Sequence, residues 1–124
     1  MGSREASRAV IQSVFDDLWN LGSLEVADHL FHPDFRADPG NGSAMTLASL
    51  KDTVKTQRER GPRLRYRVEN FVIELPWIAT RWVGTGIPSD DGEVSRWGMT
   101  LWLMKESRIV EAWVLTSGAE AITH

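Results

Sequence analysis

The strand-like segments between residues 81 and 117 carry almost no side chain that can move a proton, and the best candidates lie before residue 40. Asp38 precedes a proline in a loop rich in Asp, Pro, Gly and Asn, and His32 lies shortly before this loop. A carboxylate beside apolar walls has a raised pKa, so Asp38 can take a proton from an activated carbon or hydroxyl. The alternative interpretation is that Asp38 only forms a turn, which is the commoner use of an aspartate in a loop.

Arg81 is a third candidate, and the sequence leaves its orientation open. It precedes Trp82 in a strand-like segment, so one of these two side chains faces the interior and the other faces away. An inward Arg81 would need a partner such as Asp38 or Glu111, and this pair would anchor a carbonyl or enolate oxygen. An outward Arg81 would form a cross-strand pair on the surface.

Composition excludes several other kinds of chemistry. The chain has no cysteine, which removes disulfides, thiolate nucleophiles and cysteine-based metal sites. His29 and His32 are three residues apart, but Pro33 and the end of a short helix spoil the geometry that a metal site would need. We therefore expect no metal and no other cofactor.

Length and charge are those of one ordinary globular domain over residues 1–124. Apolar residues make up 42% of the chain and charged residues 25%, which argues against general disorder. The net charge of −3, without a basic stripe, argues against nucleic acid as a partner. No apolar run approaches the roughly 20 residues of a membrane span. The beginning of the chain lacks a signal peptide's apolar stretch, so we expect no membrane association and a cytoplasmic protein.

Helices are expected in the first half of the chain. Apolar residues recur at three- and four-residue steps over residues 4–20, which predicts an amphipathic helix. A short helix is expected over residues 24–30, followed by a loop over residues 34–42. Thr46 is a good N-cap for a third helix, which Gly61 and the following proline end.

From Leu64 onward the apolar period changes to two, which predicts β-strands. The phase slips near Asn70, and this slip predicts a β-bulge that bends the sheet. Helices followed by antiparallel hairpins make an α+β domain. The expected strands cover residues 64–75, 77–87, 93–104 and 108–117.

Tryptophan dominates this strand-forming part, because four of the six tryptophans lie between residues 81 and 117. Large aromatic rings line cores and apolar pockets, so they predict a site for an apolar small molecule. Alternation along the segment over residues 93–104 places Trp97 and Met99 on one face and Trp102 and Met104 on the other.

Six short motifs follow one another along the chain: WNLGSLE (19–25), HPDF (32–35), DPG (38–40), RWVGTG (81–86), WGM (97–99) and RIVEAW (108–113). Their order resembles that of the SnoaL-like polyketide cyclases, which belong to the nuclear transport factor 2-like superfamily together with ketosteroid isomerase. The resemblance implies a cone-shaped α+β barrel, in which N-terminal helices wrap a curved antiparallel sheet around a deep apolar pocket. It also implies a homodimer.

Most of the family's functional positions carry other residue types in this chain. The aspartate that serves as acid and base in SnoaL-like cyclases corresponds to Ser117. Two histidines that are frequent in the family correspond to Ala37 and Gly86. The general-base Asp-Pro of ketosteroid isomerase corresponds to Asp38 and its proline, whereas the oxyanion tyrosine and acid correspond to Phe15 and Met99. The resemblance thus implies the family's cone with most of its proton-transfer groups replaced.

The resemblance also orients the strands. It places Met99, and therefore Trp97, inside the cone, together with Trp113 and Ser117 on the last strand. Trp102 then faces outward, where a large aromatic side chain is typical of a covered dimer interface.

We expect a small cyclase of natural-product or antibiotic biosynthesis that holds a polyketide-like apolar intermediate and promotes ring closure. Holding a reactive chain in its ring-closing shape can lower the barrier by several kcal/mol. The alternative is a non-catalytic binding or carrier protein with the same pocket. The expected catalytic residues are Asp38, His32 and Arg81, and the expected substrate-binding residues are Phe15, Trp19, Trp82, Trp97, Met99, Trp113 and Ser117.

Overall fold

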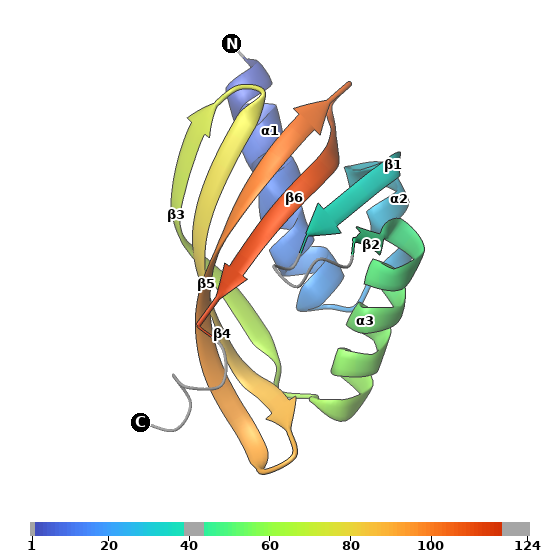
Figure 1. Cartoon of the computed structure of the whole chain (residues 1–124), viewed down its shortest axis with the longest axis vertical. Helices are drawn as coiled ribbons and strands as arrows, with labels where there is room; N and C mark the ends of the chain where they lie inside the picture. Colours follow the sequence, from blue (N-terminus) through green and yellow to red (C-terminus); the bar gives the residue numbers. More distant parts are fainter. Residues whose placement is uncertain (1, 39–43, 118–124) are drawn as a thin grey trace.

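The protein is described by a computed structural model that covers residues 2–38 and 44–117. Helices pack against one side of a strongly curved sheet (Figure 1). The helical elements are α1 (Gly2–Ser13), η1 (Val14–Trp19), η2 (Leu24–Val26), α2 (Ala27–Leu30) and α3 (Leu47–Arg60). The strands are β1 (Phe31–Asp38), β2 (Met45–Thr46), β3 (Arg65–Glu74), β4 (Trp77–Ser89), β5 (Gly92–Lys105) and β6 (Arg108–Thr116).

The three predicted helical regions are confirmed, although the winding changes in two of them. The first region is α-helical in α1 and continues as a π-helix in η1, which buries Phe15 and Leu18. The second begins as the 3-10 helix η2 before α2. The third begins at Thr46 as predicted, where Thr46 Oγ1 accepts a hydrogen bond from the Ser49 backbone N–H at 3.2 Å. Ser49 Oγ in turn accepts one from the Thr46 backbone N–H at 2.8 Å, which completes a capping box. None of the helices described is long and apolar enough to cross a membrane.

The sheet has the strand order β2-β1-β6-β5-β4-β3, and it is mixed where we expected an antiparallel sheet. Strand β1 pairs in parallel with β6, and every other neighbouring pair is antiparallel. The loop predicted over residues 34–42 is wrong for residues 34–38, which belong to β1. A strand that pairs with a distant segment leaves little local signal. Among the strands described, the pairings of β1 with β2 and of β1 with β6 both lie outside the expected hairpins.

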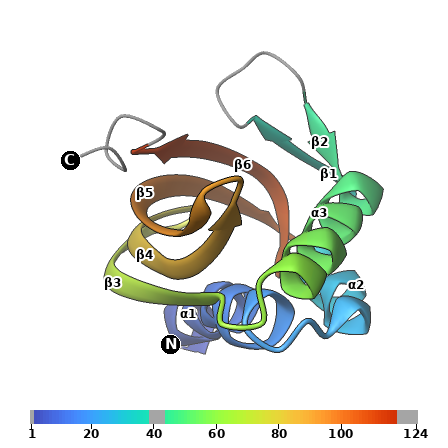
Figure 2. The ribbon, with the colours of Figure 1, turned by 90° about the horizontal axis from the view of Figure 1, so that it is seen from below.

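Irregularities in register bend the sheet into a cone. The predicted bulge near Asn70 is confirmed, because the pairing of β3 with β4 shifts between Val68 and Asn70. A further shift lies in β4 between Gly84 and Ile87. Figure 2 shows the sheet curling around, with α1 and α3 against its concave side. The predicted cone-shaped α+β fold is therefore confirmed.

The two faces of β5 are the reverse of our expectation. Trp102 and Met104 are 6% and 8% exposed and belong to the core, whereas Trp97 and Met99 are 49% and 46% exposed. Trp113 on β6 is 39% exposed, so the prediction that it is buried is wrong as well. Alternation groups side chains by face but does not identify the inner face, and both faces of β5 carry large apolar residues.

Candidate functional site

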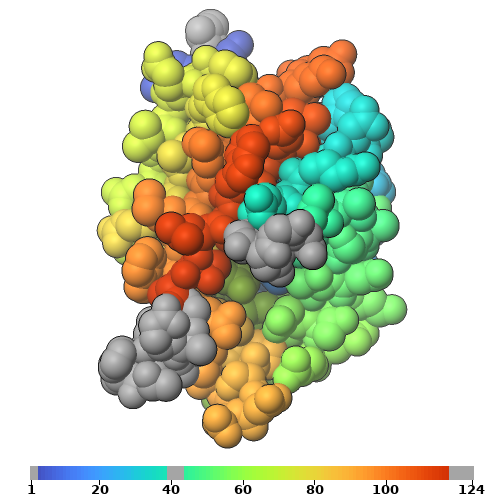
Figure 3. All heavy atoms as spheres, in the orientation of Figure 1, coloured from blue at the N-terminus to red at the C-terminus, as the bar shows by residue number. Residues whose placement is uncertain are grey.

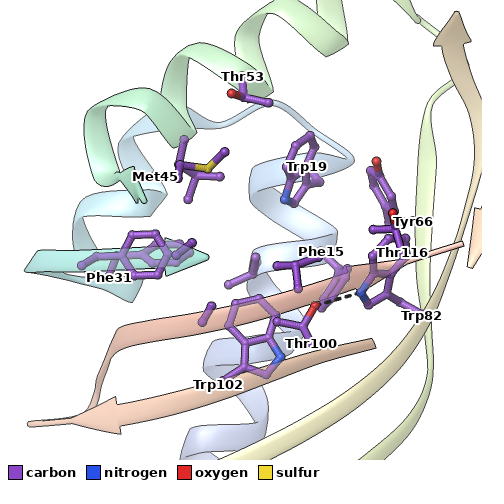
Figure 4. Close-up of a pocket in the computed structure, with 16 residues that line it drawn as sticks. Phe15, Trp19, Phe31, Met45, Thr53, Tyr66, Trp82, Thr100, Trp102 and Thr116 are labelled. Carbon is purple, nitrogen blue, oxygen red and sulfur yellow. Dashed lines mark hydrogen bonds between the residues drawn. The ribbon is translucent and has the colours of Figure 1, made fainter. Parts of the chain in front are cut away.

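A cavity of about 220 Å³ lies between the helices and the concave face of the sheet (Figure 4). Its walls come from η1, β1, β2, α3 and the inner faces of β3 to β6. Its volume is below the roughly 300–1,000 Å³ of sites for drug-sized ligands, which favours a compact ligand. The largest side chains that line it are Phe15, Trp19, Phe31, Phe35, Tyr66, Trp82 and Trp102.

One wall of the cavity is a series of aromatic rings that meet edge to face. Trp19 and Tyr66 have ring centroids 5.2 Å apart, and Tyr66 and Trp82 have centroids 5.4 Å apart. On another wall, Phe15 meets Trp102 in the same way at 6.0 Å. Such pairs contribute about 0.5–1.5 kcal/mol each beyond their burial, so the wall is held in a fixed shape.

Two glycines make room for this wall. Gly84 is in register with Tyr66, and a Cβ atom at Gly84 would lie 2.5 Å from Tyr66 Cε1. Gly98 is in register with Trp82, and a Cβ atom there would overlap the Trp82 ring. The rings of β3 and β4 therefore lie over backbone that carries no side chain.

Buried threonines hold the two indoles that project from the sheet into the core. Trp82 Nε1 donates a hydrogen bond to Thr100 Oγ1 at 2.9 Å, which Figure 4 marks with a dashed line. Trp102 Nε1 donates to Thr80 Oγ1 at 3.0 Å. A buried indole N–H needs such a partner, so these bonds fix the rings without supplying an acid or a base.

Tyr66 brings a hydroxyl to the cavity. Burial raises the pKa of its phenol above the ordinary value of 10.0, and the positive charge of nearby Arg96 opposes this rise. Within the residues described, no hydrogen bond to the Tyr66 hydroxyl is formed. The phenol therefore stays protonated at neutral pH and can donate to a carbonyl or enolate oxygen of a ligand.

The chain has a single tyrosine, so the Tyr66 pKa can be measured directly. We expect phenolate absorbance in the near ultraviolet to rise with a midpoint above 10.0 in the folded protein. In denaturing urea the midpoint should return to about 10, because unfolding removes the burial that disfavours the phenolate. A native midpoint at or below the urea value would contradict the buried position of the hydroxyl.

Three of the predicted substrate-binding residues line the cavity together. Phe15 and Trp19 project into it from η1, and Trp82 projects from β4. Trp82 is only 7% exposed, which settles the open question of which side chain faces inward, Arg81 or Trp82.

The other four predicted binding residues do not line the cavity. Trp97, Met99 and Trp113 project from the outer face of the sheet, opposite to the cavity. Ser117 is buried at the end of β6, where its Oγ accepts a hydrogen bond from the Trp97 backbone N–H at 3.2 Å. Ser117 thus extends the pairing of β5 with β6 beyond the last strand residue.

The structure places Arg81 on the surface. Its Nε donates to Asn70 Oδ1 at 2.9 Å, and its Nη2 lies 3.6 Å from the carboxylate of Glu69. This arrangement is the outward cross-strand pair that the sequence left open.

His32 and Asp38 also lie outside the set of residues that line the cavity. His32 Nδ1 accepts a hydrogen bond from the Asp34 backbone N–H at 3.0 Å, and its Nε2 lies 3.3 Å from a Glu106 carboxylate oxygen. Asp38 ends β1 in register with Trp113, on the opposite face from the cavity-lining Ala37. The rest of the Asp-Pro-Gly motif, residues 39–40, falls outside the described residues. In the described part of the chain, no three His, Asp or Glu side chains are grouped to hold a metal ion.

Sequence reasoning missed two of the residues that shape the cavity most. Tyr66 shares a strand face with the apolar Leu64 and Val68, and these three alternate with charged residues, so the strand pattern already indicated that Tyr66 faces inward. Trp102 was assigned to the outer face because the family comparison placed Met99 inside. An independent signal was the threonine at position 100, whose hydroxyl serves as the acceptor for a neighbouring indole.

The fold and the cavity define a small α+β cone of the nuclear transport factor 2-like type. The SnoaL-like domain profile matches residues 11–112, so the chain belongs to the SnoaL-like family. A comparison with curated protein sequences finds no match.

Solved structures of low sequence identity share the fold. A protein of Jannaschia sp. CCS1, proposed to be a SnoaL-like polyketide cyclase, is 20% identical with a TM-score of 0.82, over 97% of this chain and 91% of its own. IdmH of Streptomyces antibioticus, also proposed to be a polyketide cyclase, is 20% identical with a TM-score of 0.77, over 90% of this chain and 91% of its own. An LEH-like epoxide hydrolase of M. tuberculosis is 8% identical with a TM-score of 0.77, over 92% of this chain and 84% of its own.

Proposed function

We propose that the protein is a small cyclase that holds a compact apolar intermediate in its cavity and promotes intramolecular ring closure. The observation that carries this proposal is the cavity itself, whose aromatic wall is fixed by ring–ring contacts and by hydrogen bonds to buried threonines. A rigid wall can hold a flexible chain with its reacting atoms close together, and orientation of this kind lowers reaction barriers by several kcal/mol. The names given to similar structures, proposed polyketide cyclases, support the same reaction class.

The chemistry that the cavity supports is hydrogen-bond donation rather than proton removal by a carboxylate. Within the described residues, no Asp, Glu, His or Lys lines the cavity. Tyr66 can donate to a carbonyl oxygen of the intermediate and stabilise the enol or enolate form during ring closure. The catalytic roles of Asp38, His32 and Arg81 remain predictions from the sequence. The cytoplasmic location of the protein also remains a prediction.

A non-catalytic binding or carrier protein is the second candidate, and one observation favours it. The three side chains expected to transfer or polarise protons do not line the cavity. A protein that only protects or delivers an apolar ring compound would need the same walls and no acid–base group.

Ligand binding can be tested by filling the cavity from one wall. Ala112 is 3% exposed and lines the cavity, so Ala112→Leu should occupy space that a ligand needs. We expect the affinity for a compact bicyclic ketone such as 2-acetylnaphthalene, measured by calorimetry, to fall about tenfold to a hundredfold. The control is Ala48→Leu, the same change at an exposed position of α3, which should bind like the parent. Equal affinities for all three proteins would remove the cavity from the proposal.

The same variants separate the enzyme from the carrier. A linear poly-β-ketone with a masked terminus serves as the substrate mimic, and its ring-closed products are quantified by chromatography. The parent and Ala48→Leu should accelerate closure over the rate in buffer, and Ala112→Leu should not. If the parent binds 2-acetylnaphthalene yet leaves the closure rate unchanged across linear substrates of different length, the carrier function is correct.

We also propose that a second copy of this chain covers the outer face of the sheet. This face presents an apolar row across four strands, formed by Val72, Ala79, Leu101 and Trp113, which are paired in register. Figure 3 shows the face with β5 and β6 across its middle. The exposed apolar side chains on it are Val72, Trp77, Trp97, Met99, Leu101, Trp113 and Leu115, each between 39% and 67% exposed.

The size of this outer apolar patch argues for a second copy. The exposed fractions of these seven side chains, multiplied by the area that large side chains present, give an exposed apolar area on the order of 600 Å². Each partner contributes roughly 800 Å² to a standard interface, so the two areas are similar. Contiguous apolar surface of this size is uncommon on a monomer. A two-fold dimer would place the same patch on both partners, so each would cover the other. We therefore propose the dimer interface on the face of β5 opposite to Trp102, although the sequence predicted it at Trp102.

A further inference from the structure

Three residues form one cross-strand row on the inner face of the sheet, beside the cavity. Tyr66 on β3 pairs with Gly84 on β4, and Gly84 pairs with Arg96 on β5. Residues in register on adjacent strands point to the same face, so Tyr66 and Arg96 flank a position that carries no side chain. The Tyr66 ring lies over Gly84, and the Arg96 charge acts on its phenol.

Arg96 has no polar partner among the residues described, in contrast to several other arginines on or beside the sheet. Arg63 is paired with Glu93 at 2.7 Å, Arg67 with Glu69 at 2.7 Å, and Arg81 with Asn70 at 2.9 Å. Among the residues described, the Arg96 side chain makes no hydrogen bond and no ion pair. Its Nε atom is buried and unsatisfied although the residue as a whole is only half-buried.

An unsatisfied guanidinium N–H in an apolar setting is costly, and an anionic oxygen is the partner that offsets this cost best. Only one other buried side-chain atom in the described chain lacks a partner, Gln57 Oε1. Gln57 follows the cavity-lining Thr53 by one helical turn on α3. Both unsatisfied groups therefore belong to residues that neighbour the cavity wall. Neither residue is one of the mainly apolar residues that line the cavity.

We propose that Arg96 and Tyr66 form a polar anchor for a carboxylate on the ligand of this cavity, so that the ligand is a compact apolar acid. This inference rests on the proposed function, in that the cavity must bind a small apolar molecule. The rings of Trp19 and Trp82 hold the apolar body, and the Tyr66 hydroxyl and the Arg96 guanidinium hold the acidic end. The ring-closing intermediate would then be a free acid, fixed at its carboxyl end while its other end folds.

The test compares two ligands of the same shape, 2-naphthoate and neutral 2-acetylnaphthalene, by calorimetry at neutral pH. The parent should bind the carboxylate about tenfold to a hundredfold more tightly than the ketone, because hydrogen bonds to charged groups are the stronger ones. Arg96→Gln should remove this preference and leave the affinity for the ketone unchanged. Tyr66→Phe should weaken the binding of both ligands, and it should reduce the preference about threefold to tenfold because a hydrogen bond to a charged oxygen is the stronger one.

The control is Arg67→Gln, which makes the same charge change next to Tyr66 but on the outer face of β3. It should retain the full preference for the carboxylate. Loss of the preference in Arg67→Gln as well would show that net charge alone is responsible, and would overturn the anchor. A parent that binds both ligands equally would overturn it too.

Failure of the anchor and failure of the proposed function give different results. A parent that binds neither ligand removes the cavity function, and the anchor with it. A parent that binds the ketone without preferring the acid removes only the anchor. If Arg96→Gln is unfolded by circular dichroism, Arg96→Lys provides the test, because it keeps the charge but loses the planar guanidinium; it should retain part of the preference.

Discussion

Leu101→Glu should convert the protein from a dimer to a monomer at micromolar concentration. Leu101 is 40% exposed at the centre of the outer face, in register with Ala79 on one side and Trp113 on the other. A carboxylate there would be desolvated without a partner in the dimer, so we expect the dimer dissociation constant to rise at least about a thousandfold. Sedimentation equilibrium of the parent and the variant measures this change.

The matched control for the dimer is Leu21→Glu, the same substitution at a side chain that is 70% exposed and lies outside the sheet. It should stay dimeric, and both variants should keep the parent's circular dichroism spectrum. A parent that is monomeric up to high micromolar concentration would contradict the dimer, and so would a Leu101→Glu variant that still dimerises. Trp102→Glu does not test this interface, because Trp102 lies in the core.

Gly98→Ala should be among the most destabilising single-methyl additions in this chain. The added Cβ would overlap the Trp82 ring, which is buried and held by its hydrogen bond to Thr100. Overpacking of this kind costs about 1–3 kcal/mol of the free energy of unfolding, and here the displaced ring also forms a cavity wall. Urea unfolding followed by tryptophan fluorescence gives the loss, and the affinity for 2-acetylnaphthalene should fall with it.

A second substitution tests whether the clash with Trp82 is the cause. Trp82→Phe leaves a smaller ring over position 98, so the Gly98→Ala/Trp82→Phe double variant should lose less stability than the sum of the two single variants. The coupling should be at least about 1 kcal/mol, because the two sites are in direct contact. Simple additivity would show that the methyl group acts through the β5 backbone instead.

Local signals in the sequence were sufficient for most secondary-structure elements. Thr46 begins α3 with its capping box because the interacting groups lie only three residues apart. The bulge near Asn70 was visible because a break in alternation is itself the local consequence of an extra residue. The helical period of the first segment was equally clear, although its final turns are wound as a π-helix.

The family, and hence the cone, also followed from the order of short motifs. Phe15 and Trp19 were expected to bind the substrate, and they line the cavity, whereas the sequence left open whether Trp82 or Arg81 faces inward. The order of motifs did not reveal the parallel pairing of β1 with β6, because these strands are far apart in the chain and no hairpin turn joins them.

Only the tertiary structure decided which face of the sheet is inside. On β5 the outer Trp97 and Met99 are as large and apolar as the inner Trp102 and Met104, so hydrophobicity by itself does not identify the inner face. The inner face also carries the small Gly98, because the Trp82 ring from the neighbouring strand lies over it. The sequence thus determined which side chains share a face, whereas packing between strands determined which face could close around a cavity.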